Sequence, residues 1–177
     1  MNVATIKRRD IANGIGVRVS LFVSGCTHHC KGCFNAEAWD FSYGTPYTEE
    51  TEEEILTLLA PDYVSGLSLL GGEPFEVSNQ RVLVTLLRRV KAMYPEKTVW
   101  CYTGYTLESD LWKESRARCE VTDEMLSMID VLVDGEFVEE QKNIRLLFRG
   151  SENQRLIDMN LTREAGTVVP WERPSKT

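Results

Sequence analysis

A repeated order of strand, loop and helix runs through most of the chain and limits the folds that it can adopt. Alternating or continuous apolar residues predict strands within residues 16–24, 66–75, 97–105, 130–137 and 146–159. Apolar residues at helical spacing predict a helix at 78–94, with Ser78 as its N-cap. A cap at Thr48 and an acidic first turn predict a helix at 48–60. Short helices are expected at 35–41 and at 122–129, the second with Thr122 as its N-cap. This order predicts an α/β fold with a mostly parallel sheet.

The residues with the most distinctive chemistry follow directly after predicted strands. They lie at 26–33, 71–74, 103–105 and 134–135. Because the carboxyl ends of parallel strands meet at one edge of a sheet, these four loops are expected to face one site. A complete eightfold (βα) barrel needs about 250 residues, and the chain has 177. We therefore expect a partial, open barrel whose uncovered side is closed by a macromolecular substrate.

Charge and hydropathy exclude several classes of partner. The chain carries 20 Lys and Arg against 27 Asp and Glu, a net charge of −7, and it has no basic run. This balance argues against nucleic-acid binding through phosphates. No apolar run is long enough to span a membrane, and the first residues do not resemble a secretory signal. The sequence therefore predicts a cytoplasmic protein without a membrane or nucleic-acid partner.

Three of the five cysteines stand within the segment SGCTHHCKGCFN, residues 24–35. Clustered thiols in a reducing compartment favour metal binding over a disulfide framework. One interpretation is structural zinc, held by Cys26, Cys30, Cys33 and either His28 or His29. The other is a four-iron cluster, in which three thiolates leave one iron without a protein ligand. An open metal position is typical of catalytic sites.

The spacing C-x-x-x-C-x-x-C resembles that of the radical S-adenosylmethionine enzymes. The resemblance implies that Cys26, Cys30 and Cys33 hold a 4Fe–4S cluster and that the open iron binds the amino and carboxylate groups of S-adenosylmethionine. An electron from the reduced cluster then splits the sulfonium into methionine and a 5′-deoxyadenosyl radical, which abstracts hydrogen.

Two further segments extend the resemblance to cofactor-binding residues. GGEP, which begins with Gly71, Gly72 and Glu73, follows a predicted strand, as the glycine-rich motif of that superfamily does. It implies that backbone groups there bind the methionine amino group, and glycine permits such close approach. Gly32, Cys33 and Phe34 occupy the segment that packs on adenine in the superfamily. Phe34 could equally belong to an apolar core.

The segments NGIGVRVSLFVSGCTHHCKGCFN, LLGGEPF, WCYTGY, VLVDGEF and FRGSENQR resemble the family that activates anaerobic ribonucleoside-triphosphate reductases. This resemblance implies a glycyl-radical-generating oxidoreductase whose partner is that reductase and whose electron comes from a low-potential donor such as flavodoxin. Three alternatives stay open at this point. They are an activase of another glycyl-radical enzyme, a small-molecule radical enzyme such as a deazaguanine synthase, and a zinc-binding interaction module.

Several other polar residues have two interpretations. Thr103, Gly104 and Tyr105 either line the pocket or form a turn closed by a buried tyrosine. Asp134 either binds ribose hydroxyls or the partner, or forms an Asp–Gly turn, and the turn is favoured. Arg18 is expected to point into the barrel, where a buried arginine needs a partner.

The residues of the last matching segment, FRGSENQR (the late motif), and the remaining thiols and histidines each have more than one interpretation. Arg149, Asn153, Gln154 and Arg155 either bind a carboxylate, dock the reductase or form a solvated loop. His28 and His29 either tune the cluster through hydrogen bonds or lie in an exposed loop, and the exposed loop is favoured. Cys101 and Cys119 are expected to be free thiols. Residues 1–160 are expected to form the radical enzyme domain, and 161–177 a flexible tail that Trp171 could anchor.

Overall fold

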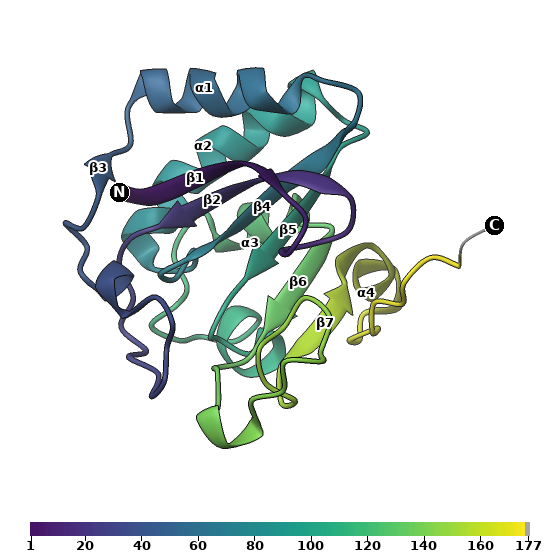
Figure 1. Cartoon of the computed structure of the whole chain (residues 1–177). Helices are drawn as coiled ribbons and strands as arrows, with labels where there is room; N and C mark the ends of the chain where they lie inside the picture. Colours follow the sequence, from purple (N-terminus) through teal and green to yellow (C-terminus); the bar gives the residue numbers. More distant parts are fainter. Residues whose placement is uncertain (176–177) are drawn as a thin grey trace.

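The computed structural model describes residues 1–175 and folds them around one open, mixed sheet (Figure 1). The strands are β1 (Asn2–Asp10), β2 (Val17–Val23), β3 (Thr45–Pro46), β4 (Val64–Gly71), β5 (Thr98–Tyr102), β6 (Val131–Asp134) and β7 (Arg155–Asp158), in the spatial order β3-β1-β2-β4-β5-β6-β7. β2, β4, β5 and β6 pair in parallel, which confirms the predicted α/β class with a parallel centre. Both edges are antiparallel, since β1 pairs with β2 and β3, and β7 pairs with β6.

Helices α1 (Glu49–Leu59), α2 (Val77–Met93) and α3 (Thr122–Ser127) cover one face of the sheet (Figure 1). The main core lies between them and the inward side chains of the central strands, where Leu21, Leu67, Leu69 and Leu132 are fully buried. Each such leucine stabilises the fold by about 1.5–3 kcal/mol. The opposite face of the sheet carries a small cluster around Trp100, covered by loops and by Trp171.

The helix starts agree with the sequence prediction in one case and differ in two. Thr48 is the N-cap of α1 and forms a capping box with Thr51, as expected for a polar residue before an acidic first turn. Ser78 was expected to cap α2, which is wrong, because the helix begins at Val77. Thr122 is the first residue of α3 and does not cap it; its buried hydroxyl instead donates to Gln80 Oε1 at 2.6 Å.

Short turns complete the fold. A 3₁₀ turn at Ala36–Trp39 replaces the short helix expected after the cysteine segment, and a second lies at Glu139–Gln141. A π-helical turn spans Leu107–Leu111. Helix α4 (Met159–Ala165) follows β7, so the expected domain boundary at residue 160 falls inside this helix.

The C-terminal segment contacts the sheet over part of its length. The backbone N–H of Trp171 donates to Leu156 O at 2.9 Å, and its ring lies 5.1 Å from Trp100. Pro170 bridges to Ile157. The last two residues of the expected tail, 176–177, lie outside the described residues. Among residues 1–175 there is no helix with the length and apolar character needed to cross a membrane.

Arg18 points from β2 into the layer opposite the helices and is completely buried. Its guanidinium donates to Ser68 Oγ at 2.7 Å and to the carbonyl oxygens of Leu67 and Thr98 at 2.9 and 2.8 Å. Within residues 1–175 the hydrogen-bond partners of the guanidinium are neutral. Burial therefore lowers the pKa of Arg18 to about 10. The partner that the sequence could not identify is therefore a set of neutral acceptors on β4, on β5 and in the loop before β2.

Asp10, which ends β1, gives a testable pH dependence. Its buried carboxylate accepts hydrogen bonds from Ser20 Oγ, Ala12 N and Asn13 Nδ2 at 2.7, 2.9 and 2.6 Å. Burial opposes the charge, but these bonds outweigh it and lower the pKa of Asp10 below its usual value. The carboxylate therefore stabilises the fold above that usual pKa, and the contribution is lost as pH falls through the folded pKa.

We expect Asp10→Asn to lower the free energy of unfolding by about 1 kcal/mol near neutral pH. The difference from the wild type should shrink as pH falls below the usual carboxyl pKa and through the lower folded pKa, because the wild-type carboxyl then becomes protonated. Urea denaturation at several pH values measures both. Asp62→Asn, at an exposed position, is the matched control. A difference between Asp10→Asn and wild type that stays constant with pH would contradict the assignment.

Candidate functional site

The cysteine segment begins at the carboxyl end of β2 and is fixed there by backbone hydrogen bonds. Gly25 N donates to Ala38 O at 2.7 Å, and Cys26 N donates to Trp39 O at 3.2 Å. Gly25 has φ = +99°, a conformation that glycine adopts without strain. The start of the segment is therefore held by the 3₁₀ turn that follows it.

The three thiols predicted as metal ligands line one cavity of about 140 Å³. The same cavity is lined by Phe34, Leu70, Gly71, Gly72 and Glu73, and by residues that follow β5 and β6. The structure thus brings together seven of the eight residues predicted as cluster or cofactor contacts: Cys26, Cys30, Cys33, Phe34, Gly71, Gly72 and Glu73. Gly32 does not line this cavity, and a Cβ there would lie 2.8 Å from Glu139 Oε1. Phe34 stands at the rim, with 91% of its surface exposed.

The thiols suit a group that supplies positive charge. All five cysteines are free, and burial raises the pKa of Cys26 to about 12. Burial, with the nearby Glu136, also raises the pKa of Cys30. Such thiols become thiolates when a metal binds them. Among residues 1–175, no three His, Cys, Asp or Glu side chains converge as ligands of a single metal ion. A cluster does not need that convergence, because each thiolate binds a separate iron; the donor set therefore fits an iron–sulfur cluster.

The turn after β4 that contains Gly71, Gly72 and Glu73 (the glycine turn) lies against the cysteine segment. Gly72 N donates to Val23 O at 2.7 Å, and Glu73 N donates to Gly25 O at 2.8 Å. A Cβ on Gly72 would lie 2.6 Å from Gly25 O and 2.9 Å from Ala38 O. Since both obstacles are backbone atoms, only glycine allows the two segments to approach this closely.

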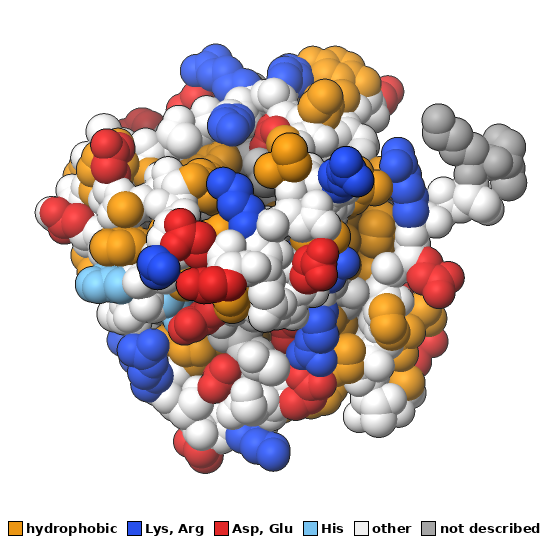
Figure 2. Space-filling model, turned by 60° about the horizontal axis from the view of Figure 1, so that its bottom comes forward, with side chains coloured by type: hydrophobic (Ala, Val, Ile, Leu, Met, Phe, Trp, Pro, Cys, Tyr) orange, Lys and Arg blue, Asp and Glu red, His pale blue; other side chains and the backbone are white. Residues whose placement is uncertain are grey.

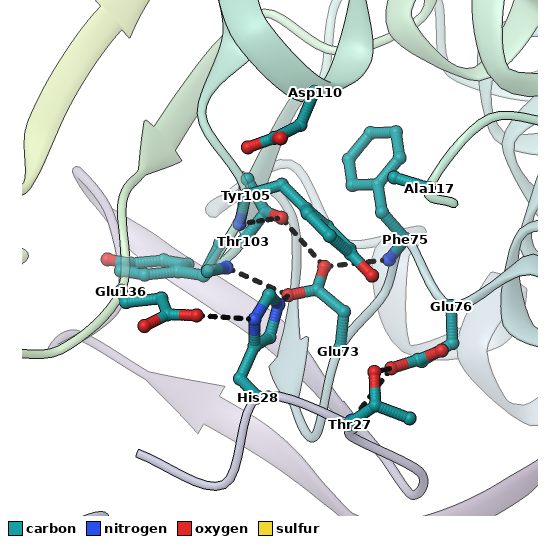
Figure 3. Close-up of polar contacts among 12 residues, drawn as sticks. Thr27, His28, Glu73, Phe75, Glu76, Thr103, Tyr105, Asp110, Ala117 and Glu136 are labelled. Carbon is teal, nitrogen blue, oxygen red and sulfur yellow. Dashed lines mark hydrogen bonds and ion pairs between the residues drawn. The ribbon is translucent and has the colours of Figure 1, made fainter. Parts of the chain in front are cut away.

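Glu73 connects three strand ends through its carboxylate (Figure 3). The side chain is 1% exposed, and its Oε1 accepts from Phe75 N at 2.9 Å and from Thr103 Oγ1 at 2.7 Å. Oε2 accepts from Gly104 N at 2.8 Å and lies 2.9 Å from His28 Nε2. The carboxylate therefore binds the glycine turn, the loop after β5 and the cysteine segment to one another.

The two histidines of the cysteine segment occupy different environments. His28 was expected in an exposed loop, which is wrong, because its side chain is only 4% exposed. Its two ring nitrogens each lie 2.9 Å from a carboxylate oxygen, of Glu73 and of Glu136. Burial disfavours the charged ring, but these carboxylates outweigh it and raise the pKa of His28. His29 is exposed, as expected, and stacks on Trp39 at 4.5 Å.

Asp134 and Arg155 form a second polar connection. Asp134 is buried, and its carboxylate accepts from Leu107 N at 2.9 Å and from Arg155 Nε and Nη2 at 2.9 and 2.6 Å. Arg155 also pairs with Glu108, and these two acids raise the pKa of the guanidinium. Both predicted residues thus bind each other across β6 and β7.

The rest of the late motif folds onto itself. Gln154 Nε2 donates to Gly135 O at 3.0 Å, and Asn153 Nδ2 donates to Glu136 O at 2.8 Å. Arg149 Nη1 donates to Gln154 O. These contacts shape the loop that follows β6 and place Gln154 in the wall of the thiol cavity.

A second, wider cavity of about 500 Å³ adjoins the thiol cavity. The two share His28, Gly104 and Gly135 in their walls. Polar groups dominate the second cavity, including Asp110 and Arg116, neither of which the sequence had singled out. Arg116 Nη1 donates to Thr27 Oγ1 at 3.0 Å, a contact between residues 89 positions apart that no sequence pattern could reveal.

Comparison with known proteins agrees with this geometry. Residues 12–157 match the model of a family described as a 4Fe-4S single cluster domain. A Haemophilus influenzae protein named anaerobic ribonucleoside-triphosphate reductase-activating protein is 42% identical over 156 residues, 87% of this chain and 96% of its own length. Proteins of the same name are 44% identical over 147 residues in Vibrio cholerae (82% and 90% covered) and 40% identical over 158 residues in Enterobacteria phage T4 (88% and 93% covered). Because relatives of this identity match over nearly their whole length, the chain belongs to the family of anaerobic ribonucleoside-triphosphate reductase-activating proteins.

Proposed function

We propose that the chain is a radical S-adenosylmethionine enzyme that generates the glycyl radical of an anaerobic ribonucleoside-triphosphate reductase. One observation carries the proposal. Three thiols, without a fourth cysteine beside them, line a cavity together with a glycine turn at the carboxyl ends of parallel strands. Three thiolates on a four-iron cluster leave one iron open for a ligand that is not part of the protein.

The proposal gives each group of residues a task. Cys26, Cys30 and Cys33 hold the cluster, which when bound supplies the electron that splits the sulfonium of S-adenosylmethionine into methionine and a 5′-deoxyadenosyl radical. Backbone groups at residues 71–73 bind the methionine end, because the Glu73 carboxylate already makes four contacts within the chain. Gly32, Cys33 and Phe34 are proposed for the adenine end.

The sheet supports a protein as the second substrate. We propose that its parallel centre forms part of an open (βα) barrel of the radical enzyme type, with the uncovered side at the mouth of the thiol cavity. A reductase loop that closes this side would exclude water from the radical. The wide polar cavity beside His28 offers an entry for such a loop. The glycine of such a loop would be the hydrogen donor for the chemistry that the cluster and S-adenosylmethionine would supply there.

The proposal also includes an electron donor and a compartment, and it excludes two other kinds of ligand. We propose a low-potential donor such as flavodoxin as the electron source and the cytoplasm as the compartment. Figure 2 shows acidic and basic side chains interspersed on one face, with no continuous basic area there that would suit phosphates. Each ring nitrogen of His28 lies 2.9 Å from a carboxylate oxygen, which stands where a zinc ion would have to bind. This arrangement disfavours His28 as a zinc ligand.

The test is anaerobic reconstitution with iron and sulfide, followed by reduction and addition of S-adenosylmethionine. We expect 5′-deoxyadenosine, and with purified reductase a glycyl radical detected by electron paramagnetic resonance. Cofactor cleavage without a radical on the reductase would favour another glycyl-radical enzyme or a small molecule as substrate. One zinc per chain, with neither iron nor sulfide after anaerobic purification, would refute the proposal.

A further inference from the structure

His28 lies midway between two of the proposed cluster ligands, Cys26 and Cys30, yet its ring points into the protein (Figure 3). Its side chain is 4% exposed, whereas the next residue, His29, is exposed. The ring meets Tyr105 edge-on, with 4.5 Å between centroids. A residue of the cysteine segment is thus inserted between the loops that follow β4 and β5.

The group that His28 contacts is itself rigid. The Glu73 carboxylate is held by two backbone N–H groups, those of Phe75 and Gly104, and by the Thr103 hydroxyl. A bond from His28 Nε2 to this carboxylate therefore fixes the cysteine segment to two strand ends at once. On the other side of the ring, Glu136 bonds Nδ1 and connects the segment to the loop after β6.

The segment has few other buried attachments beyond Cys26. Thr27 N and Oγ1 bond to Glu76 Oε1 at 2.8 and 2.6 Å, but this contact is exposed. Further along, Lys31 makes exposed ion pairs at 3.4 Å. Exposed ion pairs such as those of Lys31 stabilise little. Thr27 is held by exposed hydrogen bonds to Glu76 and from Arg116. The His28 ring is the buried side-chain anchor between Cys26 and the two later thiols.

Gly104 provides the space for the ring. A Cβ at this position would lie 2.7 Å from both His28 Cδ2 and His28 Nε2. The backbone of Gly104 does not have a positive φ, so alanine is compatible with its conformation. The obstacle to alanine is the imidazole ring, which gives a way to displace His28 without changing it.

We propose that His28 is a positioning residue of this family member: it sets the distance between the cluster thiols and the glycine turn by joining the cysteine segment to the Glu73 carboxylate. This inference rests on the proposal that Cys26, Cys30 and Cys33 hold the cluster. His28 is not a ligand, because carboxylates engage both of its ring nitrogens. Groups that orient metal ligands in this indirect way change affinity or activity by about 10–100-fold when removed.

The experiment compares reconstituted wild type with His28→Ala, His28→Gln and the matched control His29→Gln. We expect His28→Ala to bind iron and sulfide but to lose the change in the cluster's electron paramagnetic resonance spectrum that S-adenosylmethionine induces. Cleavage should fall about 10–100-fold, mainly through a higher KM for S-adenosylmethionine. His28→Gln should recover part of both, since its amide can still donate to Glu73, and His29→Gln should match wild type.

Gly104→Ala tests the same contact from the other side. We expect it to reduce the spectral change and cleavage in the wild-type background. In the His28→Ala background it should have little further effect, because the ring that alanine strikes is gone. If His28→Ala fails to fold, the same comparison is made between Gly104→Ala alone and Gly104→Ala in the His28→Gln background.

Two results would overturn the inference. One is His28→Ala behaving like His29→Gln; the other is losses from Gly104→Ala and His28→Ala that simply add. A wild type that forms no cluster, or cleaves no S-adenosylmethionine, would instead refute the proposed function.

Discussion

Serine at Cys26, Cys30 or Cys33 is expected to abolish reductive cleavage of S-adenosylmethionine. Each thiolate holds a different iron, so the loss of one leaves the cluster incompletely bound. A serine hydroxyl is a poor substitute, because it ionises far less readily than a thiol. Iron and sulfide analysis and the yield of 5′-deoxyadenosine, both measured under anaerobic conditions, report the two consequences separately.

Cys119→Ser is the matched control for these variants. Cys119 is half-buried, lies outside the thiol cavity, and its Sγ donates to Gln80 Oε1 at 3.5 Å, which a hydroxyl can also do. It should retain full iron content and cleavage. Thermal unfolding of the metal-free proteins excludes a general loss of structure. Retained cleavage in any of the three cavity variants would place the cluster elsewhere.

The centre of the fold could be predicted because its signals are local. Apolar alternation located β2, helical spacing located α2, and the cap at Thr48 with the acidic turn after it located α1. The placement of the thiols beside Gly71 and Gly72 followed from a general property of parallel strands, whose carboxyl ends share one edge. Chain order alone therefore placed the candidate site.

The edges of the sheet could not be predicted in the same way. β1 contains Lys7, Arg8 and Arg9, and most of its residues are partly or fully exposed. Such a strand lacks the apolar pattern that identifies buried strands, and it forms because β2 offers a free edge for antiparallel pairing. β3 contributes two exposed residues, which carry no sequence signal at all.

The environment of His28 also depends on contacts that are distant in the sequence. Its neighbours Thr27 and His29 are exposed, so local sequence predicts an exposed loop. Glu73 and Glu136, which surround the ring, lie 45 and 108 residues away. Only the parallel arrangement of β4, β5 and β6 brings these carboxylates to the same point, and one sequence does not specify that register.

Arg18→Leu is expected to lower the free energy of unfolding by about 3 kcal/mol. The guanidinium donates to the buried carbonyl oxygen of Leu67 and to the partly buried carbonyl oxygens of Ile15 and Thr98, and each hydrogen bond lost here costs about 1–3 kcal/mol. The opposing term is the cost of burying the charge, visible in the pKa of about 10; it amounts to about 3 kcal/mol. The lost hydrogen bonds outweigh this relief, so the variant should be less stable.

For a chain of this size, that loss corresponds to a fall in Tm of about 6–12 °C. Arg8→Leu on the neighbouring strand is the matched control, because Arg8 makes an exposed pair with Glu54 and should change stability by less than about 0.5 kcal/mol. An Arg18→Leu protein as stable as wild type would mean that water satisfies these carbonyls. A large loss would identify Arg18 as the cross-link that holds β2, β4 and β5 in register. Since the thiols and the glycine turn lie at the ends of these strands, the geometry of the site depends on that register.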